Sequence, residues 1–302
     1  MENKLLIDKY PDLESEILRN VREALAEDLG PTFPMFLNGN AKFESIDLTG
    51  SIIEREKTGS ATVIAREKAV FCGKLWFEKV FNLLCKELQI NWSVKDGEKV
   101  GSRNLICEIN GPIWAILAGE RTALNFIQTF SGTATSTSEL IELLSGSNVN
   151  ILDTRKTIPG LRLAQKYAVN CGGGKNHRLG LYDQILIKEN HIAARGSIAK
   201  TISELKTRFP KKSLEIEVED FDQLHQVLEA GVDIILLDNF SIDEISQAVK
   251  LIAKQAKIEI SGNISAKDIP ELINLEIDYI SVGALTKNIR AIDLSMIIDS
   301  TK

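Results

Sequence analysis

The second half of the chain alternates short apolar runs with helical patterns, and this alternation constrains the fold more than any other feature. The apolar runs, all after about residue 149, are NILDTR, QILIKEN, SLEIEVE, DIILLDN, IEISGN and YISVGA. Helical patterns such as IAKTISELKTRF and IDEISQAVKLIAKQ lie between most of them. Nearly continuous apolar strands separated by helices are typical of a parallel sheet covered on its outer faces. The sequence therefore predicts an α/β domain of repeating βα units.

An open doubly wound sheet and a closed barrel both fit this alternation. An eight-unit barrel needs about 250 residues, whereas about 140 residues separate Val149 from Arg290. A reduced barrel or an open sheet remains, and in either one the functional side chains lie at the carboxyl ends of the strands. Those ends carry Asp153 to Lys156, Lys188 to Asn190, Glu217 with Glu219, Asp238 with Asn239, Ser261 to Asn263, and Gly283.

The first 110 residues mix helical and strand patterns, which predicts an α+β domain. LESEILRNVREALAEDL and LWFEKVFNLLCKEL have helical periodicity, and SATVIARE, AVFCG, INWSV and LICEI have the composition of strands. The turn-rich stretch at 30–51 is expected to be a loop. A long helical region begins at Pro112, and Gly119 and Gly132 predict bends or separate helices within it.

The charge of the chain is unevenly distributed. The net charge is -6 and the isoelectric point is near 5.4, which argues against a general nucleic-acid or anionic-membrane surface. From Asp153 to Lys188, however, seven residues are basic and two are acidic, a local charge of +5. One concentrated basic segment in an acidic protein predicts a pocket for a small, strongly anionic ligand.

The sequence has no segment typical of membrane insertion or secretion. MENKLLIDKYPDLE is too charged for a secretory signal, and no apolar run approaches the ~18 residues of a membrane span. The cysteines Cys72, Cys85, Cys107 and Cys171 have no CxxC spacing, which fits free thiols in a reducing compartment. We therefore expect a cytoplasmic protein.

The first candidate group consists of basic residues at or near the predicted strand ends. Its members are Arg155, Lys156, His177, Arg178 and Lys188. Arginine matches a carboxylate or phosphate with two parallel hydrogen bonds, and lysine adds a compact charge, so the group suits a polyanion. Solvated surface charge is the alternative for each residue, and we prefer it for Lys166 and Lys175. Lys188 ends an apolar strand, where a lysine is costly without an anionic partner.

The stretch CGGGKNHR, residues 171–178, is rich in glycine but fits neither nucleotide-binding loop. A Walker loop needs a glycine where Val169 stands and Ser or Thr where Asn176 stands, and the dinucleotide fingerprint needs a glycine in place of His177. We interpret the stretch as a flexible turn that carries His177 and Arg178 to an anion, with a plain solvated turn as the alternative.

The second and third groups lie on later strands. Glu215, Glu217 and Glu219 alternate, so all three face one side of a strand, where with Asp238 they suit magnesium bound mainly through substrate phosphates. An internal salt-bridge network is the alternative. The third group is Ser261, Gly262, Asn263 and Gly283. Loops after the late strands of barrel enzymes frequently bind phosphate through backbone amides, and simple turn formation is the alternative.

Several longer segments together resemble quinolinate phosphoribosyltransferase, the carboxylating nicotinate-nucleotide pyrophosphorylase. They are ERTALNFIQTFSGTAT, DTRKTIPGLRLAQKYAVNCGGGKNHRLGLYDQILIKENHI, EIEVE, LLDNF, ISGNI and ISVGALT. The resemblance implies an N-terminal α/β sandwich, residues 1–130 completed by 291–302, and an incomplete α/β barrel of about seven strands, residues 131–290. It also implies phosphoribosyl transfer from phosphoribosyl pyrophosphate to quinolinate with decarboxylation, giving nicotinate mononucleotide for NAD synthesis.

The resemblance further implies roles for individual residues. The pyridine dicarboxylate would be surrounded by Arg155, His177, Arg178 and Lys188, and by Arg121 from the neighbouring subunit of a homodimer. Phosphoribosyl pyrophosphate would be served by Lys156, Glu217 and Asp238 as catalytic residues. Glu217 and Asp238 would meet Mg²⁺ directly, or through water or substrate. The 5-phosphate would be held by the backbone at Ser261, Gly262, Asn263 and Gly283.

Two departures from the family pattern stand out. Lys287 stands where many relatives have a histidine, and the segment between Gly30 and Gly50 is longer than the usual link. That extra length is either a harmless insertion or a change at the dimer edge. The alternatives to this assignment are a divergent relative acting on another anion, a Schiff-base aldolase using Lys188, and a noncatalytic module that binds phosphate ligands.

Overall fold

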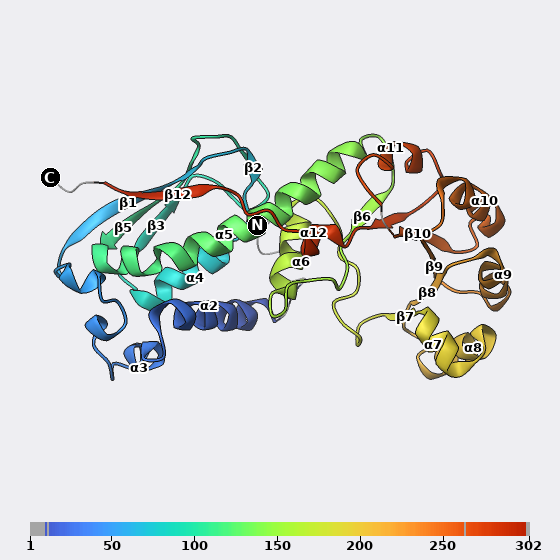
Figure 1. Cartoon of the computed structure of the whole chain (residues 1–302), viewed down its shortest axis with the longest axis horizontal. Helices are drawn as coiled ribbons and strands as arrows, with labels where there is room; N and C mark the ends of the chain where they lie inside the picture. The colour runs from blue at the N-terminus through green and yellow to red at the C-terminus, as the bar shows by residue number, and fades with distance from the viewer. Residues whose placement is uncertain (1–9, 11, 263, 300–302) are drawn as a thin grey trace. The chain divides into compact units, whose positions relative to one another are not determined.

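The computed structural model describes residues 10, 12–262 and 264–299. The chain forms two compact units. The first consists of Met1–Ser136, Ile158–Gly173 and Asn288–Lys302, and the second of Thr137–Thr157 and Gly174–Lys287. Figure 1 follows the chain through both units by colour.

The first unit contains a four-stranded antiparallel sheet in the order β12-β1-β5-β3. These strands are β1 (Thr58–Ala65), β3 (Gln89–Trp92), β5 (Leu105–Pro112) and β12 (Leu294–Ile298). A second, two-stranded sheet pairs β2 (Ala69–Val70) with β4 (Lys99–Val100). Because β12 pairs along β1, the last described segment of the chain completes the sheet that the first hundred residues begin.

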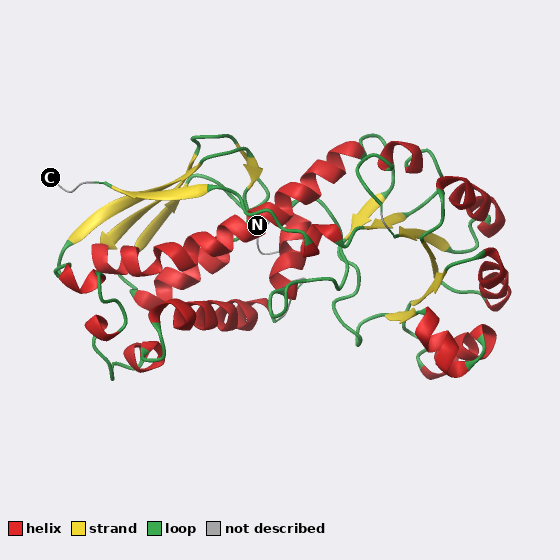
Figure 2. Cartoon of the chain, viewed as in Figure 1, coloured by secondary structure: helices red, strands yellow, loops and turns green. Residues whose placement is uncertain are grey.

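Helices gather along one face of the four-stranded sheet (Figures 1 and 2). They are α2 (Leu13–Leu29), α4 (Lys74–Leu84), α5 (Ile113–Leu143) and α6 (Arg162–Cys171). Trp76 on α4 is fully buried, with its ring against Phe130 and Tyr167 at centroid distances of 4.9 and 5.5 Å. The predicted helices and strands of this region are confirmed, with ends that differ by a few residues.

Of the two expectations for Gly119 and Gly132, bends or separate helices, the second is wrong, because α5 is one helix of 31 residues. Both glycines serve packing instead. A Cβ at Gly119 would lie 2.6 Å from Cε1 of Phe81, and one at Gly132 would lie 2.2 Å from the carbonyl oxygen of Arg290. Because a larger residue would clash at these two positions, glycine is required there despite its lower helix propensity.

The stretch at 30–51 was expected to be a loop and instead contains three short helical segments. They are α3 (Phe33–Leu37) and the 3₁₀ turns η1 (Phe43–Ser45) and η2 (Gly50–Ile52). Phe43 is buried with its ring 4.8 Å from that of Trp114, and the guanidinium of Arg55 lies 3.5 Å above the Trp114 ring. Aromatic packing therefore orders a segment whose composition is typical of turns.

The second unit contains a six-stranded parallel sheet in the order β6-β11-β10-β9-β8-β7. The strands are β6 (Asn150–Leu152), β7 (Ile185–Ile187), β8 (Leu214–Val218), β9 (Ile234–Asp238), β10 (Lys257–Ser261) and β11 (Tyr279–Ser281). All six correspond to the predicted apolar runs. The helices are α7 (Glu189–Arg195), α8 (Ile198–Arg208), α9 (Phe221–Ala230), α10 (Ile242–Ile252), α11 (Ile269–Leu272) and α12 (Ala284–Lys287).

This sheet curves with its helices outside, as in an incomplete α/β barrel (Figure 2). Beyond β6, a single residue continues the barrel wall. Leu152 and Lys175 form a parallel bridge, in which Lys175 N donates to Ile151 O and Asp153 N donates to Lys175 O. The described residues thus provide six strands and a one-residue seventh position, where the resemblance implied about seven strands. The glycine-rich stretch 171–178 therefore contributes to the barrel wall itself.

Candidate active site

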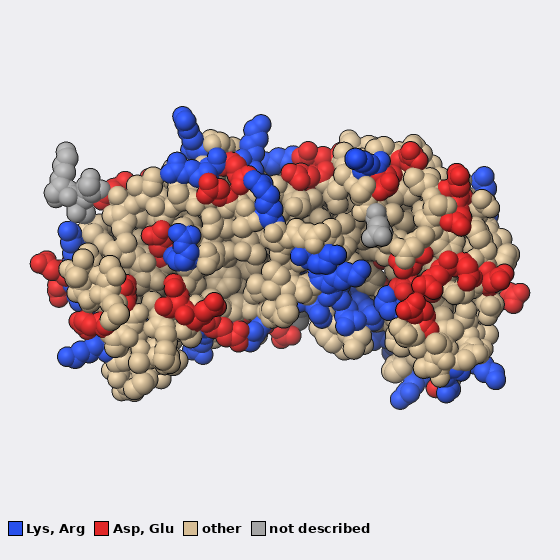
Figure 3. Space-filling view, viewed as in Figure 1, with Lys and Arg blue, Asp and Glu red and all other residues tan. Residues whose placement is uncertain are grey.

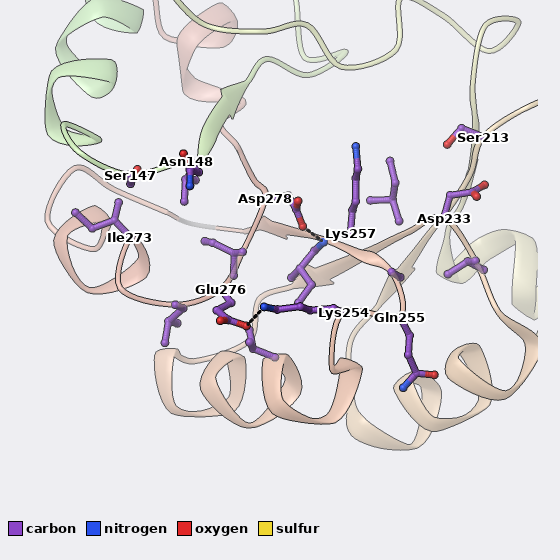
Figure 4. A pocket seen from close by; sticks show the side chains of 18 of the residues that line it. Ser147, Asn148, Ser213, Asp233, Lys254, Gln255, Lys257, Ile273, Glu276 and Asp278 are labelled. Carbon is purple, nitrogen blue, oxygen red and sulfur yellow. Dashed lines mark hydrogen bonds and ion pairs between the residues drawn. The ribbon is translucent and has the colours of Figure 1, made fainter.

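Two ends of the barrel sheet offer places for a ligand, and Figure 4 shows the pocket at the amino-terminal ends of the strands. That pocket has a volume of about 1160 Å³. Its charged groups bind backbone amides or pair with one another. Asp233 accepts a hydrogen bond from Leu214 N at 2.8 Å, and Asp278 accepts one from Ile258 N at 2.9 Å. Lys254 lies 3.4 Å from Glu276.

The carboxyl ends of the strands carry the predicted functional residues, and there the charges are not balanced in this way. Figure 3 shows the contrast on one face of the molecule, where basic atoms form a compact patch and acidic atoms form a band beside it. Barrel enzymes place their active sites at the carboxyl ends of the strands. We therefore take this end, and not the pocket at the amino-terminal ends, as the candidate active site.

Two arginines stand at the basic side of this end. Arg178 is buried, and its Nε has no hydrogen-bond partner among the described residues. Burial, and then the positive charge of Arg155, lower the pKa of Arg178, while Glu215 opposes the shift. A buried guanidinium with an unused donor, next to a second and exposed guanidinium, is an unbalanced arrangement that an anion would complete.

Two aspartates hold the loop that carries Arg178. Asp153, fully buried after β6, accepts from His177 N at 2.9 Å and from the Asn176 side chain at 2.6 Å. Asp183 accepts from Leu179 N at 2.6 Å and from Gly180 N at 2.9 Å. From the sequence, Asp153 was expected at a strand end and Asp183 was only an acidic residue in a basic segment, and neither was expected to hold this loop. Two sequence signals pointed to this role. Asp153 directly follows a predicted strand, and Asp183 lies within a few residues of the turn at Leu179 and Gly180.

The His177 side chain is turned toward carboxylates inside the barrel. Its Nδ1 accepts a hydrogen bond from Arg178 N at 2.6 Å, so the ring proton is on Nε2. Nε2 lies 3.2 Å from Glu215 Oε2 and 3.6 Å from Glu259 Oε1. The Gln184 side chain donates to the same Glu215 oxygen, Oε2, at 2.8 Å. His177 thus links the basic loop to the barrel interior through neutral and charge-assisted hydrogen bonds.

Glu259 was not predicted as a site residue. In the structure it lies on β10 and is almost completely buried. Burial first, and then the charge of Glu215, raise the pKa of Glu259 to about 8. Alternation on β10 places Glu259 on the opposite face from the buried Ile258 and Ile260. A glutamate between two isoleucines was the sequence signal for a polar side chain that faces the barrel interior.

An ion pair and an acidic cluster occupy the neighbouring strand ends. Lys188 Nζ pairs with Glu217 Oε2, so the strand-end lysine has the anionic partner that its position requires. Glu217 extends from β8 beside Lys188 because Ile187 and Ile216 are paired in the parallel register. A hydrogen bond with Glu189, followed by burial and by nearby carboxylates that include Asp238, raises the pKa of Glu219.

Glu217 and Asp238 fit the ligand chemistry of a hard cation. Both carboxylates stand at the ends of adjacent strands, and after a hydrogen bond with Glu189 and burial their charges contribute to the raised pKa of Glu219. Oxygen ligands of this kind suit Mg²⁺ that keeps several waters or substrate phosphates. Lys188 holds one oxygen of Glu217, which leaves the other carboxylate oxygen for such a contact.

The glycine-bearing strand ends are closely packed. A Cβ at Gly262, where φ is +122°, would lie 2.8 Å from Asn239 Oδ1. Asn239, itself at φ 58°, donates from its backbone to Ser261 O at 3.1 Å and from its side chain to Asp238 at 2.8 Å. This interlocking joins the predicted phosphate-binding backbone to one of the predicted catalytic carboxylates.

Gly283 has a similar function at the end of β11. A Cβ there would lie 2.9 Å from Cδ of Lys156, so the glycine leaves room for the lysine stem. Thr286 donates to Lys156 O at 2.9 Å, and Lys156 N donates to Thr154 Oγ1 at 3.0 Å. These bonds fix the backbone of Lys156 while its side chain stays exposed.

The remaining predicted residues have different surroundings. Arg121 lies on α5 in the first unit with 61% of its side chain exposed, and Lys175 and Lys287 are exposed. Asn263 lies outside the described residues. The preference for solvated surface charge at Lys166 is wrong, because this side chain is fully buried. Among the described residues, no helix is long and apolar enough to cross a membrane.

Family models match both parts of the chain. The model for the C-terminal domain of quinolinate phosphoribosyl transferase matches residues 133–297, and the model for the N-terminal domain matches residues 47–131. A probable nicotinate-nucleotide pyrophosphorylase (carboxylating) of Bacillus subtilis is 40% identical over 251 residues, which are 83% of this chain and 87% of that protein.

Further relatives agree in sequence and in structure. Quinolinate phosphoribosyltransferase (decarboxylating) 1b of Nicotiana tabacum is 34% identical over 259 residues, 80% of this chain and 73% of that protein. The nicotinate-nucleotide pyrophosphorylase structure from Francisella tularensis has a TM-score of 0.85 at 44% identity. The match covers 94% of this chain and 96% of that one.

Proposed function

The chain belongs to the quinolinate phosphoribosyltransferase family, and we propose that its basic loop and its carboxylate cluster divide the two substrates between them. The reaction transfers a phosphoribosyl group from phosphoribosyl pyrophosphate to quinolinate and releases pyrophosphate and carbon dioxide. Its product is nicotinate mononucleotide, a precursor in the de novo synthesis of NAD. The division of roles follows from the charges at the carboxyl end of the barrel.

The single observation that carries the quinolinate assignment is the pair Arg155 and Arg178. Arg178 is buried with an unused donor, and the charge of Arg155 already lowers its pKa. A dicarboxylate neutralises both guanidiniums and accepts their parallel hydrogen bonds, whereas a neutral ligand leaves the repulsion in place. His177 positions Arg178 through its Nδ1, and Lys188 completes the basic side of the pocket.

Phosphoribosyl pyrophosphate takes the opposite side in this proposal. Lys156 neutralises the leaving pyrophosphate, and Glu217 and Asp238 face the ribose and meet Mg²⁺, directly or through water. Mg²⁺ supplies charge stabilisation to the phosphates when it is bound. The 5-phosphate lies against the backbone ends of late strands, at Ser261, Gly262, Asn263 and Gly283.

The chemistry requires positioning more than proton transfer. The bond between ribose C1 and the pyrophosphate oxygen breaks with both electrons leaving on oxygen, and the lone pair of the quinolinate nitrogen forms the new bond to C1. The Glu217 and Asp238 carboxylates stabilise the positive charge that develops on the ribose. The carboxylate next to the ring nitrogen then leaves as carbon dioxide, its bonding electron pair stays on the ring carbon where the adjacent cationic nitrogen stabilises it, and that carbon takes up a proton from water to give the product. Desolvation around the buried Arg178 strengthens these interactions.

The proposal includes a homodimer in which Arg121 reaches the quinolinate site of the neighbouring subunit. The exposed Arg121 side chain, which lies 3.9 Å from the Glu120 carboxylate, supports this role. We also propose a cytoplasmic location without nucleic-acid or membrane partners. The four free cysteines and the net charge of -6 support it.

Turnover with defined substrates tests the function. The protein is incubated with Mg²⁺, phosphoribosyl pyrophosphate and quinolinate labelled in the carboxylate next to the ring nitrogen, and nicotinate mononucleotide and labelled carbon dioxide are measured together. We expect equal amounts of the two products. Conversion of nicotinate or another acceptor, without any from quinolinate, would contradict the assignment. An adduct trapped on Lys188 by borohydride would instead support a Schiff-base aldolase.

A further inference from the structure

Two cysteines of the first unit lie close together and have no part in the proposed reaction. Cys72 lies between β2 and α4 and is fully buried, and Cys171 is the last residue of α6 and is partly exposed. The two sulfur atoms and a carboxylate oxygen of Asp96 all lie within 4.8 Å of one another. Such an approach between cysteines that are 99 positions apart in the sequence is a feature of the fold and not of local sequence.

The surroundings hold Cys72 in place. Its backbone N donates to Ser131 Oγ at 2.9 Å, and the same hydroxyl donates back to Cys72 O at 3.3 Å. Gly73 follows at φ +114°, and a Cβ there would lie 3.2 Å from Ile127 and from Phe130. These contacts fix the backbone at Cys72 and at the residue that follows it.

Cys171 is held much less firmly. It ends α6, and the next three residues, at 172–174, are glycines. Glycine accepts a wide range of backbone angles, so this segment permits a shift of the helix end. A covalent link between the two sulfurs would therefore move Cys171 and leave Cys72 where it is.

We propose that Cys72 and Cys171 form a reversible disulfide site, closed by a peroxide or by a small-molecule disulfide. With hydrogen peroxide, the Cys171 sulfur attacks one peroxide oxygen and becomes a sulfenic acid, while the other oxygen leaves as water. The Cys72 sulfur then displaces the sulfenic oxygen, which leaves as a second water with the thiol proton. Two thiols are oxidised and one peroxide is reduced.

The order of these steps follows from exposure. Burial, followed by contact with Cys171, raises the pKa of Cys72, so this residue stays a thiol until its partner has been oxidised. The Asp96 carboxylate lies next to both sulfurs and can relay the thiol proton to the departing oxygen in the second step. A disulfide also removes the need to bury negative charge on sulfur beside Asp96.

A metal ion is the competing occupant, and the contacts favour the disulfide. Asp96 Oδ1 already accepts from Gly73 N at 2.9 Å and Lys74 N at 3.2 Å, and Oδ2 accepts from the Tyr167 hydroxyl at 2.7 Å. A metal would have two sulfurs and this committed carboxylate, one ligand short of a tetrahedral structural site. Metal content is therefore measured as well, and stoichiometric bound metal would contradict the disulfide.

The disulfide has a consequence for the substrate loop, and this part rests on the proposed function. Cys171 begins the stretch CGGGKNHR, which ends in His177 and Arg178. A shift of its first residue is passed along the glycines toward those two side chains. We expect oxidation to raise the KM for quinolinate by about 10-fold, since displacements of about 1 Å at a site cost up to 100-fold. The KM for phosphoribosyl pyrophosphate changes little.

Thiol counting and peptide mapping test the site without reference to activity. The full-length protein is treated with hydrogen peroxide, or with oxidised glutathione, then denatured, and its free thiols are titrated. We expect the count to fall from four to two, with a linked peptide that contains Cys72 and Cys171, and to return to four with dithiothreitol. Cys85→Ser is the matched control, because Cys85 is also partly exposed and should leave the link intact.

Cys72→Ser and Cys171→Ser should each abolish the linked peptide and the oxidation-dependent rise in the quinolinate KM. A link through Cys85 or Cys107, an unchanged count of four, or stoichiometric zinc that protects the thiols until a chelator is added would overturn the proposal. If the reduced protein makes no nicotinate mononucleotide, the proposed function fails while the peptide map still decides the disulfide.

Discussion

Arg155 is the exposed member of the guanidinium pair, so its removal tests quinolinate recognition with little disturbance of the fold. We expect Arg155→Ala to raise the KM for quinolinate about 100-fold, because a charge-assisted pair contributes about 3 kcal/mol. The KM for phosphoribosyl pyrophosphate should change far less. Steady-state kinetics with each substrate varied in turn measures both values.

Two further variants make this test specific. Arg155→Lys keeps the charge but loses the planar fork, so its quinolinate KM should lie between those of the wild type and the alanine variant. Lys175→Ala removes an exposed charge from the same basic segment and should leave both KM values unchanged. Equal losses for both substrates in Arg155→Ala would argue against the role given to this residue.

Glu259 gives a prediction about stability and pH. Its pKa is raised from 4.5 to about 8 in the folded protein, so the native state keeps a proton that the unfolded chain loses between these values. Raising the pH through this window therefore favours unfolding. Glu259→Gln imitates the protonated form, so its Tm should fall less between pH 5 and pH 8.5 than that of the wild type, while the two should be similar at pH 5.

Thermal unfolding over a pH series provides the measurement. Glu229→Gln, an exposed position on α9, is the matched control and should follow the wild-type curve. Parallel curves for the wild type and Glu259→Gln would show that Glu259 is already ionised in the folded protein. The readout is independent of whether His177, which faces the same carboxylates, also contacts substrate.

At the residue scale, the sequence predicted which kind of partner a side chain needs better than it predicted which residues the fold places next to it. Lys188 was expected to have an anionic partner because charge at a strand end is costly, and Glu217 is that partner. Burial of Lys166 was not predictable, since a lysine on an amphipathic helix gives no sign of its solvent exposure. Asp153 and Glu259 were missed as structural partners because their bonds are formed by residues that the fold brings together.

At the level of strands and their ends, Gly262 gives the sharpest test. Gly262→Ala would place a Cβ 2.8 Å from Asn239 Oδ1, displacing the amide that bonds to Asp238. We expect the KM for phosphoribosyl pyrophosphate to rise about tenfold, the effect of some 1.4 kcal/mol of lost binding. Gly146→Ala is the control, because it also has positive φ, at +85°, but nothing within 4 Å.

The Gly146→Ala variant should lose some thermal stability with unchanged kinetics, since it shares the backbone strain without the contact. Similar kinetic losses in both glycine variants would mean that strain alone, and not the Asn239 contact, is responsible. A larger rise in the quinolinate KM than in the phosphoribosyl pyrophosphate KM would contradict the phosphate-side assignment of Gly262.

Elements were predictable where a single periodicity dominated. All six barrel strands appear where apolar runs predicted them, because parallel strands covered by helices are rich in apolar residues. The failures at α5 and at 30–51 have one cause. Glycine and proline are read as breaks by local rules, whereas tertiary contacts with Phe81, Arg290 and Trp114 decide what these residues do.

At the scale of the whole molecule, alternation and length together favoured a reduced barrel or an open sheet over an eight-unit barrel. The parallel bridge between Leu152 and Lys175 explains why apolar runs alone undercount the barrel wall. A one-residue strand has no periodicity for a sequence pattern to detect. Assembly is a further step, because a side chain that serves a neighbouring subunit looks like any exposed arginine in the sequence.

Complementation between two defective proteins tests this assembly. Arg121→Ala and Arg155→Ala should each be nearly inactive alone, because every site then lacks one of its arginines. In a mixed dimer, one site combines intact Arg155 from one chain with intact Arg121 from the other, and the second site lacks both. Equal mixing and re-association gives half mixed dimers, so about a quarter of wild-type activity should return.

The fraction recovered distinguishes the possible arrangements. If Arg121 served the site of its own chain, every site in a mixed dimer would still lack one arginine, and mixing would restore nothing. Mixing Arg155→Ala with Lys156→Ala is the matched control. Both of these residues belong to the same barrel, so no mixed dimer contains an intact site. Recovery in this control would instead mean that Arg155 and Lys156 of one chain serve different sites, and it would remove the argument for Arg121 as the shared residue.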